Sequence, residues 1–253
     1  MGRVDGKVCI VTGGAMGLGR ADAIVLAREG GRVVITDVNA DIGRATVAEM
    51  GGDALFVHHD VRDEDGWQAL IAAVMDRYGR LDVLVNNAGV LRVGDIESAT
   101  LEDWRFVLSV NVEGTFLGCK YGIAAMRAGG GGSIINLSST VALLGFPGAA
   151  AYTASKGAIQ ALTRSIAAHC LARGDRIRCN GIYPHLHESP MATSANDPGA
   201  IRLASPFAAA NAVLFLASDE SSELNGTFLN LDRGTSTLVP ETPVPASLIP
   251  PRA

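Results

Sequence analysis

Aromatic residues are scarce in this chain of 253 residues: they make up 5% of it, although 48% of the residues are hydrophobic. A core with so few aromatic rings must be packed mainly by Val, Ile, Leu and Ala, which is typical of parallel sheets buried on both faces. The length suits one large α/β domain, and no shift in composition divides the chain. We therefore expect a single domain with an aliphatic core.

Other absences exclude whole classes of function. No apolar run reaches about 18 residues, and the chain enters a predicted strand too early for a signal peptide. The net charge is −5 without a basic run, which argues against nucleic acid or an anionic membrane as a partner. The cysteines lack the spacing of metal ligands and are expected to be reduced core residues; they are Cys9, Cys119, Cys170 and Cys179. We expect a cytoplasmic protein.

Apolar, β-branched runs alternate with helical segments along the chain. Strands are predicted at residues 8–12, 32–37, 55–57, 83–85, 133–137, 176–182 and 226–231. Helices are predicted at residues 17–28, 39–50, 64–78, 101–126, 151–173 and 207–216. This alternation predicts a Rossmann-type, doubly wound parallel sheet flanked by helices on both faces. The domain is expected to cover residues 1–239, with a substrate loop at about 184–206, and a proline-rich tail at 240–253.

A glycine cluster lies between the first predicted strand and the first predicted helix, where Thr12 to Gly19 read TGGAMGLG. Glycines also serve ordinary turns, but here they allow a pyrophosphate to approach the backbone at a helix N-terminus. Asp37 ends the second predicted strand and can accept hydrogen bonds from both hydroxyls of a ribose. Its carboxylate would repel a 2′-phosphate, which predicts NAD rather than NADP. The alternative for Asp37 is a solvated acid at a strand end.

A tyrosine and a lysine, Tyr152 and Lys156, lie four residues apart in the long helix predicted at 151–173. Residues at this spacing share one face of a helix. A tyrosine hydroxyl with a pKa near ~10 is a poor acid or base at neutral pH, and a nearby ammonium is expected to lower that pKa. Taken alone, Tyr152 would more often be a core tyrosine at an interface. With Lys156 beside it, the pair predicts proton transfer.

Several motifs together resemble the short-chain dehydrogenases/reductases, from about residue 5 to residue 235. They are the segment 12–19, Asn86-Asn87-Ala88-Gly89, Asn111, Ser138-Ser139, Tyr152-Thr153-Ala154-Ser155-Lys156 and Asn180-Gly181-Ile182-Tyr183-Pro184. Segments 56–61 and 217–222 are further similar to bacterial hydroxysteroid dehydrogenases. The combination is far more specific than any one element.

The resemblance implies catalytic roles for Ser139, Tyr152, Lys156 and Asn111. Tyr152 would be the general acid in ketone reduction and the base in alcohol oxidation, and Lys156 would lower its pKa and bind the nicotinamide ribose. The family's serine lies 13 residues before the tyrosine, which selects Ser139 over Ser138 to polarise the substrate oxygen. Asn111 would hold a water that relays protons from Lys156. Alternatively, Ser139 would only terminate the preceding strand, and the Asn111 side chain would only form local hydrogen bonds.

The resemblance also implies an NAD site and a homotetramer. The residues expected to bind the cofactor are Gly13, Met16, Gly17, Leu18, Gly19, Asp37, Asp60, Val61, Asn87, Gly89, Tyr152, Lys156, Pro184, His187 and Ser189. Asp60 and Val61 would flank the adenine, and Asn87 and Gly89 would line the ribose side.

The chain departs from the family pattern after Pro184, where the family usually has a glycine, an aliphatic residue and a threonine. His185 stands in place of that glycine, His187 in place of the aliphatic residue, and Ser189 keeps the hydroxyl. Two histidines and Glu188 rarely suffice for a metal, so no metal is expected. Arg233 replaces another glycine, and a short segment at 191–206 predicts an open pocket for a bulky substrate.

The expected function is NAD-dependent interconversion of a secondary alcohol and a ketone, with a small-molecule substrate such as a hydroxysteroid or another bulky cyclic alcohol. Two alternatives stay open. One is a ketoreductase for acyl-carrier substrates, which usually uses NADPH and which Asp37 disfavours. The other is a catalytically weak NAD-binding protein in which the altered loop at 184–189 serves regulation or assembly. The proline-rich tail would help close a neighbouring subunit's pocket.

Overall fold

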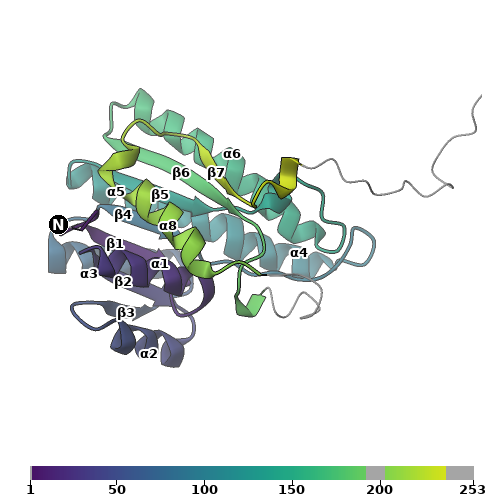
Figure 1. The fold of residues 1–253 in the computed structure, drawn as a ribbon, viewed down its shortest axis with the longest axis horizontal. Helices are drawn as coiled ribbons and strands as arrows, with labels where there is room; N and C mark the ends of the chain where they lie inside the picture. Colours follow the sequence, from purple (N-terminus) through teal and green to yellow (C-terminus); the bar gives the residue numbers. More distant parts are fainter. Residues whose placement is uncertain (1, 192–202, 238–253) are drawn as a thin grey trace, which may run out of the picture.

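The computed structural model describes residues 2–191 and 203–237, and the described chain forms a seven-stranded sheet with helices on both faces (Figure 1). The strands pair in the order β3-β2-β1-β4-β5-β6-β7, and every pair is parallel. The strands are β1 (Val8–Thr12), β2 (Arg32–Asp37), β3 (Leu55–His58), β4 (Val83–Asn86), β5 (Gly132–Leu137), β6 (Ile177–Pro184) and β7 (Phe228–Leu231). The predicted doubly wound Rossmann-type fold is confirmed.

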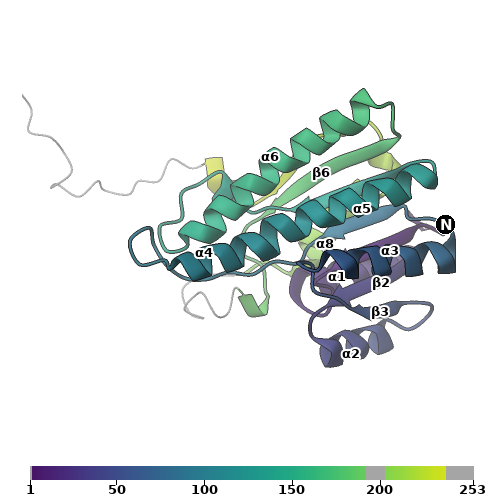
Figure 2. The same cartoon turned by 180° about the vertical axis from the view of Figure 1, so that it is seen from behind.

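The sheet divides the aliphatic core into two layers, each covered by helices. The helices are α1 (Gly17–Arg28), α2 (Ala40–Met50), α3 (Glu64–Tyr78), α4 (Leu101–Leu108), α5 (Gly114–Ala128), α6 (Ala150–Ala172) and α8 (Pro206–Ala217). Helices α1, α2 and α8 cover one face of the sheet, and α3, α5 and α6 cover the other (Figures 1 and 2). Their buried side chains form one core cluster on each face. The few aromatic rings include Trp67, which is fully buried on the second face.

The position of a site follows from the strand order. From β1, the strands β2 and β3 are added on one side and β4 to β7 on the other, so the order switches between β1 and β4. In open parallel sheets, ligands bind outside the carboxyl ends of the strands at this switch point. The segments after β1, β4, β5 and β6 carry the glycine cluster, Asn87, Ser139 and His185 respectively. The fold therefore brings these sequence motifs to one edge.

The stretch predicted at 101–126 is helical throughout and continues to Ala128, but it is not one regular helix. A π-helical turn at Ser109–Glu113 separates α4 from α5. Within it the Asn111 carbonyl accepts a hydrogen bond from Thr115 Oγ1 at 2.7 Å, and the Asn111 amide reaches back to Val90. A hydroxyl bonded to the carbonyl four residues earlier often bends a helix.

The substrate loop predicted at about 184–206 contains regular pairing. β6 continues to Pro184, and His187 then forms a bridge with Ala204. The Glu188 N–H donates to the Ala204 carbonyl, and the Ala204 N–H donates to the Leu186 carbonyl, both at 2.9 Å. The short segment at 191–206 and the proline-rich tail at 240–253 fall mainly on residues 192–202 and 238–253, which lie outside the described residues. All four cysteines are buried free thiols. Within residues 2–191 and 203–237, no helix has the length and hydropathy needed to cross a membrane.

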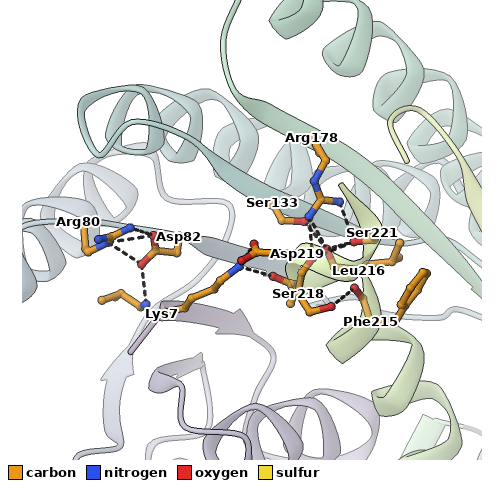
Figure 3. Close-up of polar contacts among 12 residues, drawn as sticks. Lys7, Arg80, Asp82, Ser133, Arg178, Phe215, Leu216, Ser218, Asp219 and Ser221 are labelled. Carbon is orange, nitrogen blue, oxygen red and sulfur yellow. Dashed lines mark hydrogen bonds and ion pairs between the residues drawn. The ribbon is translucent and has the colours of Figure 1, made fainter. Parts of the chain in front are cut away.

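A polar cluster braces the amino-terminal edge of the sheet, opposite the carboxyl ends of the strands (Figure 3). The Arg178 guanidinium donates to the carbonyls of Leu216 and Ser218 at 3.1 and 3.2 Å and to the Ser221 hydroxyl at 2.9 Å. Ser133 Oγ donates to the Leu216 carbonyl at 2.7 Å. The last carbonyls of a helix have no partner within it, so these donors fasten the end of α8 to β5 and β6.

Replacing Arg178 by methionine should lower the free energy of unfolding by about 1–3 kcal/mol, because charged hydrogen bonds to the end of α8 are lost while the aliphatic stem is kept. Urea denaturation followed by circular dichroism measures the change. The exposed Arg176 directly precedes the same strand, and Arg176→Met should lower the free energy of unfolding by less than about 0.5 kcal/mol. Equal losses in the two variants would contradict the brace.

A fully buried acid lies in α1. Asp22 is 0% exposed, and neither carboxylate oxygen has a hydrogen-bond partner among the described residues. Burial raises the pKa of the Asp22 carboxyl well above its ordinary value of 3.8, because the apolar surroundings disfavour the charged form. Asp22 is therefore expected to be protonated in the folded protein at pH values at which the unfolded chain carries it as a carboxylate.

The free energy of unfolding should fall as pH rises from about 4, since the unfolded state then binds fewer protons at this position than the folded state. The loss amounts to about 1.4 kcal/mol per pH unit until the raised pKa is reached. In Asp22→Ala this contribution to the slope should be absent, so the free energy of unfolding of the variant should rise relative to that of the wild type as pH increases above about 4 in urea titrations. Asp76→Ala, on the exposed face of α3, should keep the wild-type slope. Parallel profiles for Asp22→Ala and the wild type would contradict the buried protonated acid.

Candidate active site

A cavity of about 750 Å³ lies at the carboxyl ends of the strands. Most of the predicted site residues line it: Gly13, Met16, Gly17, Leu18, Asp37, Asp60, Val61, Asn87, Gly89, Ser139, Tyr152, Lys156, Pro184, His187 and Ser189. Gly19 and Asn111 do not line it; both lie buried next to residues that do. The sequence motifs thus converge on one space.

The glycine cluster forms a tight turn against the end of β4. Gly13 and Gly17 have φ angles of 63° and 57°, which favour glycine, and a Cβ on Gly13 would come within 2.9 Å of Asn87 Nδ2. Asn87 Nδ2 donates to the carbonyls of Thr12 and Gly13 at 2.9 and 3.0 Å, so its amide holds the turn in place. A Cβ on Gly19 would come within 2.3 Å of the same amide. Gly19 is therefore needed for close packing.

The N-terminus of α1 opens beside this turn. Its N-cap, Met16, makes no side-chain capping bond, and the first turn contains no acidic residue. Uncapped N–H groups and the positive end of the helix dipole suit a phosphate group. The structure therefore fits the predicted pyrophosphate position.

Asp37 occupies the end of β2, at the rim of the cavity. Its Oδ2 accepts from the backbone N–H of Ala15 at 3.2 Å, and its Oδ1 accepts from that of Asn39 at 2.9 Å. The carboxylate is thus fixed in orientation and half-buried rather than free in solvent. Each oxygen keeps a lone pair for a further donor, such as a ribose hydroxyl.

The predicted adenine side contains groups that the motifs do not reveal. Asp60 pairs with Arg62, whose Nε lies 3.0 Å from both carboxylate oxygens, and this pair lowers the pKa of the Asp60 carboxyl. The Arg62 guanidinium lies 5.6 Å from the centre of the Phe106 ring, and both residues line the cavity. Val61 is buried, and its carbonyl accepts from Trp67 Nε1 at 2.9 Å. No local signal in the sequence brings Phe106 to Arg62.

Ser139, Tyr152 and Lys156 meet between β5, α6 and the end of β6. Ser139 follows β5, and its Oγ donates to the Pro184 carbonyl at 3.4 Å. Lys156 is 4% exposed, and its Nζ donates to the Leu137 carbonyl at 2.8 Å. The same Nζ lies 5.4 Å from the centre of the Tyr152 ring, as the shared helix face predicts.

The pKa of Tyr152 does not shift as the sequence predicts. Burial raises the pKa of Tyr152 to about 12, and a hydrogen bond with Ser139 opposes the rise. Burial also lowers the pKa of Lys156 to about 8. The expected depression by Lys156 is absent because its ammonium lies over the ring and bonds to Leu137. Desolvation is the larger effect on both groups.

Asn111 is 0% exposed, and protein groups occupy its side chain. Its Oδ1 accepts from Val90 N at 2.8 Å, while its Nδ2 donates to the Val90 carbonyl and to Ser155 Oγ at 3.0 and 2.9 Å. A Cβ on Gly89 would lie 3.3 Å from Asn111 Oδ1 and 3.5 Å from Lys156 Nζ. The amide therefore positions the wall beside Lys156, and its role in a proton relay stays a prediction.

The altered loop after Pro184 adopts an ordinary backbone. Among the described non-glycine residues only Arg233 has a positive φ, so His185 fills a usual glycine position without left-handed strain. His187 is 5% exposed, and burial lowers its pKa, which favours the neutral ring at pH 7. Ser189 lies against the glycine cluster, since a Cβ on Gly17 would come within 3.2 Å of the Ser189 Cβ. Over the described part of the chain, no three His, Cys, Asp or Glu side chains converge as a possible metal site.

The remaining wall is mostly apolar, and the motifs did not identify it. It includes Val141, Leu144, Phe146, Leu186 and Met191. Leu144 and Phe146 are 38% and 47% exposed although both are large hydrophobic residues. The sequence does contain a sign of these residues: the segment between Ser139 and Tyr152 is mostly apolar, whereas an ordinary surface loop contains more polar residues.

Comparisons with known proteins agree with this geometry. The family model described as short chain dehydrogenase matches residues 7–199. A 3-beta-hydroxysteroid dehydrogenase of Comamonas testosteroni is 43% identical over 244 residues, which cover 91% of this chain and 96% of the relative. A cyclopentanol dehydrogenase of Comamonas sp. (strain NCIMB 9872) is 40% identical over 248 residues, which cover 92% of this chain and 98% of the relative.

A solved structure is also similar. The crystal structure of levodione reductase has a TM-score of 0.88 and 31% sequence identity, and the match covers 93% of this chain and 99% of that one. Family model, relatives and structure thus agree over nearly the whole chain, and the chain belongs to the short-chain dehydrogenase family.

Proposed function

We propose that the protein is an NAD-dependent oxidoreductase that interconverts a secondary alcohol and a ketone on a bulky or cyclic substrate. The observation that carries the proposal is the convergence of Ser139, Tyr152 and Lys156 in one cavity with the glycine cluster and Asp37. The named activities of the relatives, on a 3-beta-hydroxysteroid and on cyclopentanol, support a cyclic secondary alcohol. The apolar wall of the cavity suits such a ring.

The residues of the cavity divide the work of the reaction. The nicotinamide, when bound, supplies or accepts the hydride. The Tyr152 hydroxyl gives a proton to the substrate oxygen in ketone reduction and takes it back in alcohol oxidation. Ser139 Oγ donates a hydrogen bond to the same oxygen and stabilises the negative charge that develops there. With a pKa of about 12, Tyr152 rests as the neutral acid at pH 7.

Lys156 and Asp37 act on the cofactor side in this proposal. Lys156 binds the nicotinamide ribose, and its charge offsets the cost of forming a tyrosinate during oxidation. Asp37 accepts hydrogen bonds from the adenosine ribose, while its fixed carboxylate disfavours a 2′-phosphate. NAD is therefore the preferred cofactor, and an acyl-carrier ketoreductase that uses NADPH is the weaker candidate.

Tyr152→Phe tests the proposed chemistry. The variant should bind NADH as the wild type does, because the ring remains, but kcat for cyclic secondary alcohols should fall by about 10²–10⁴-fold with the loss of the transferable proton. Stopped-flow turnover and NADH fluorescence titration measure the two properties. Tyr121→Phe removes a hydroxyl that bonds to the surface residue Glu64 and should leave kcat unchanged. Undiminished turnover in Tyr152→Phe would overturn the proposed mechanism, and NADH binding by a wild type inactive on every alcohol would favour the binding-protein alternative.

Asp37→Ser tests the cofactor assignment. Removing the fixed carboxylate should lower the ratio of kcat/KM with NAD⁺ to kcat/KM with NADP⁺ by at least about tenfold, because repulsion of the 2′-phosphate is relieved. Both coenzymes are assayed on one alcohol at one ionic strength. Asp53→Ser changes an exposed acid in the turn before β3 and should not alter the ratio. A wild type that prefers NADP⁺ would contradict the NAD assignment.

A further inference from the structure

His185 is held beside the predicted proton-transfer groups but takes no part in the chemistry proposed for them. Its Nδ1 lies 3.0 Å from Thr140 Oγ1, and Thr140, which directly follows Ser139, is 2% exposed. On its other side, His185 follows Pro184, whose carbonyl accepts from Ser139 Oγ. The backbone before His185 and the Nδ1 atom of its ring are thus both held by hydrogen bonds, on the side of the cavity that contains Ser139.

The second ring nitrogen of His185 remains available. Within residues 2–191 and 203–237, Nε2 has no hydrogen-bond partner, and it is not among the buried polar atoms that lack one. The half-buried ring lines the cavity. A bond at Nδ1 fixes the ring orientation and leaves Nε2 as the hydrogen-bonding atom that a ligand can reach.

Besides His185, the polar residues that line the cavity after β5 and β6 are Ser138, Ser139, Thr140, His187 and Ser189; the three hydroxyls after β5 bond within the protein, and His187 is 5% exposed. Val141, Leu144, Phe146 and Leu186 contribute apolar surface. The charged residues Asp37, Asp60 and Arg62 line the cofactor side rather than the segments after β5 and β6. Pockets of this kind obtain orientation and specificity from a small number of placed polar groups.

We infer that His185, oriented by Thr140, recognises a second hydroxyl on the substrate ring, so that a cyclic diol is preferred over the corresponding simple alcohol. This inference rests on the proposed function and names its substrate class. A hydroxyl both donates and accepts, so it can pair with Nε2 in either neutral tautomer of the ring. Thr140 is a positioning residue in this arrangement, and His185 determines specificity.

The test compares cyclohexanol with the 1,2-, 1,3- and 1,4-cyclohexanediols. The wild type should show a higher kcat/KM for at least one diol, and in His185→Phe this preference should fall about tenfold because the ring keeps its size but loses its nitrogens. Thr140→Val should lower the preference by about threefold, mainly through KM, since the imidazole remains but is no longer oriented. His185→Gln, whose amide can donate and accept, should recover part of the preference.

His58→Phe is the matched control, because His58 is an exposed histidine at the end of β3 that does not line this cavity. It should keep the wild-type preference. A wild type that does not favour any diol, or a His185→Phe variant with the wild-type preference, would overturn the inference while leaving the oxidoreductase proposal intact.

Binding without turnover separates the two proposals. An alcohol cannot react with NADH, so calorimetric titration of each diol and of cyclohexanol into the NADH complex measures affinity alone. The best diol should bind the wild type about tenfold more tightly than it binds His185→Phe. If no alcohol turns over with either coenzyme, the proposed function fails, and this titration still decides whether His185 binds the second hydroxyl.

Discussion

The buried hydrogen bond from the Lys156 ammonium to the Leu137 carbonyl, at 2.8 Å, is the interaction on which the arrangement of the site depends. An ammonium that is 4% exposed needs fixed partners in place of water. The Ser138 hydroxyl in turn donates to the Lys156 carbonyl at 2.8 Å, so side chain and backbone both fasten α6 to the end of β5. A shift of α6 by one residue would rotate Tyr152 by about 100° and remove it from the cavity. The register of this helix is therefore a requirement of the chemistry.

The same burial acts in opposite directions on the two groups that it brings together. It raises the pKa of Tyr152 to about 12 and lowers the pKa of Lys156 to about 8, because a low dielectric disfavours the charged form of either group. The closeness of the Lys156 ammonium on the same helix face predicts the opposite shift, a lowered pKa for Tyr152. The contact geometry explains the difference, since the ammonium bonds to Leu137 rather than to the tyrosine hydroxyl. A neutral Tyr152 is suited to give a proton to a ketone oxygen.

The sequence predicted the strands and most helices well because local rules determine them: β-branched runs, glycine stops and helical spacing. It also predicted which motifs meet, because parallel strands end at one edge. It could not predict contacts that depend on side-chain packing across the fold. Examples are the Asn87 amide that holds the glycine turn and the Arg62 guanidinium over Phe106. The π turn at Asn111 belongs to the same class, since its bonds reach Val90 and Ser155.

The two positions where this chain replaces a usual family glycine, His185 and Arg233, differ in their backbone, because only Arg233 has a positive φ. Arg233 has a φ of 55°, a conformation that favours glycine, and the Asp232 carboxylate holds this turn by accepting from the backbone N–H groups of Gly234 and Ser236 at 2.9 and 2.7 Å. Bonds from Ser236 and its neighbours lower the pKa of Asp232 to about 2, so the turn keeps its charge at neutral pH. His185 needs no such support. The loop lies against the glycine cluster through Ser189, and His185 and His187 line the cavity, so the proposed change is one of side chains at the cavity wall.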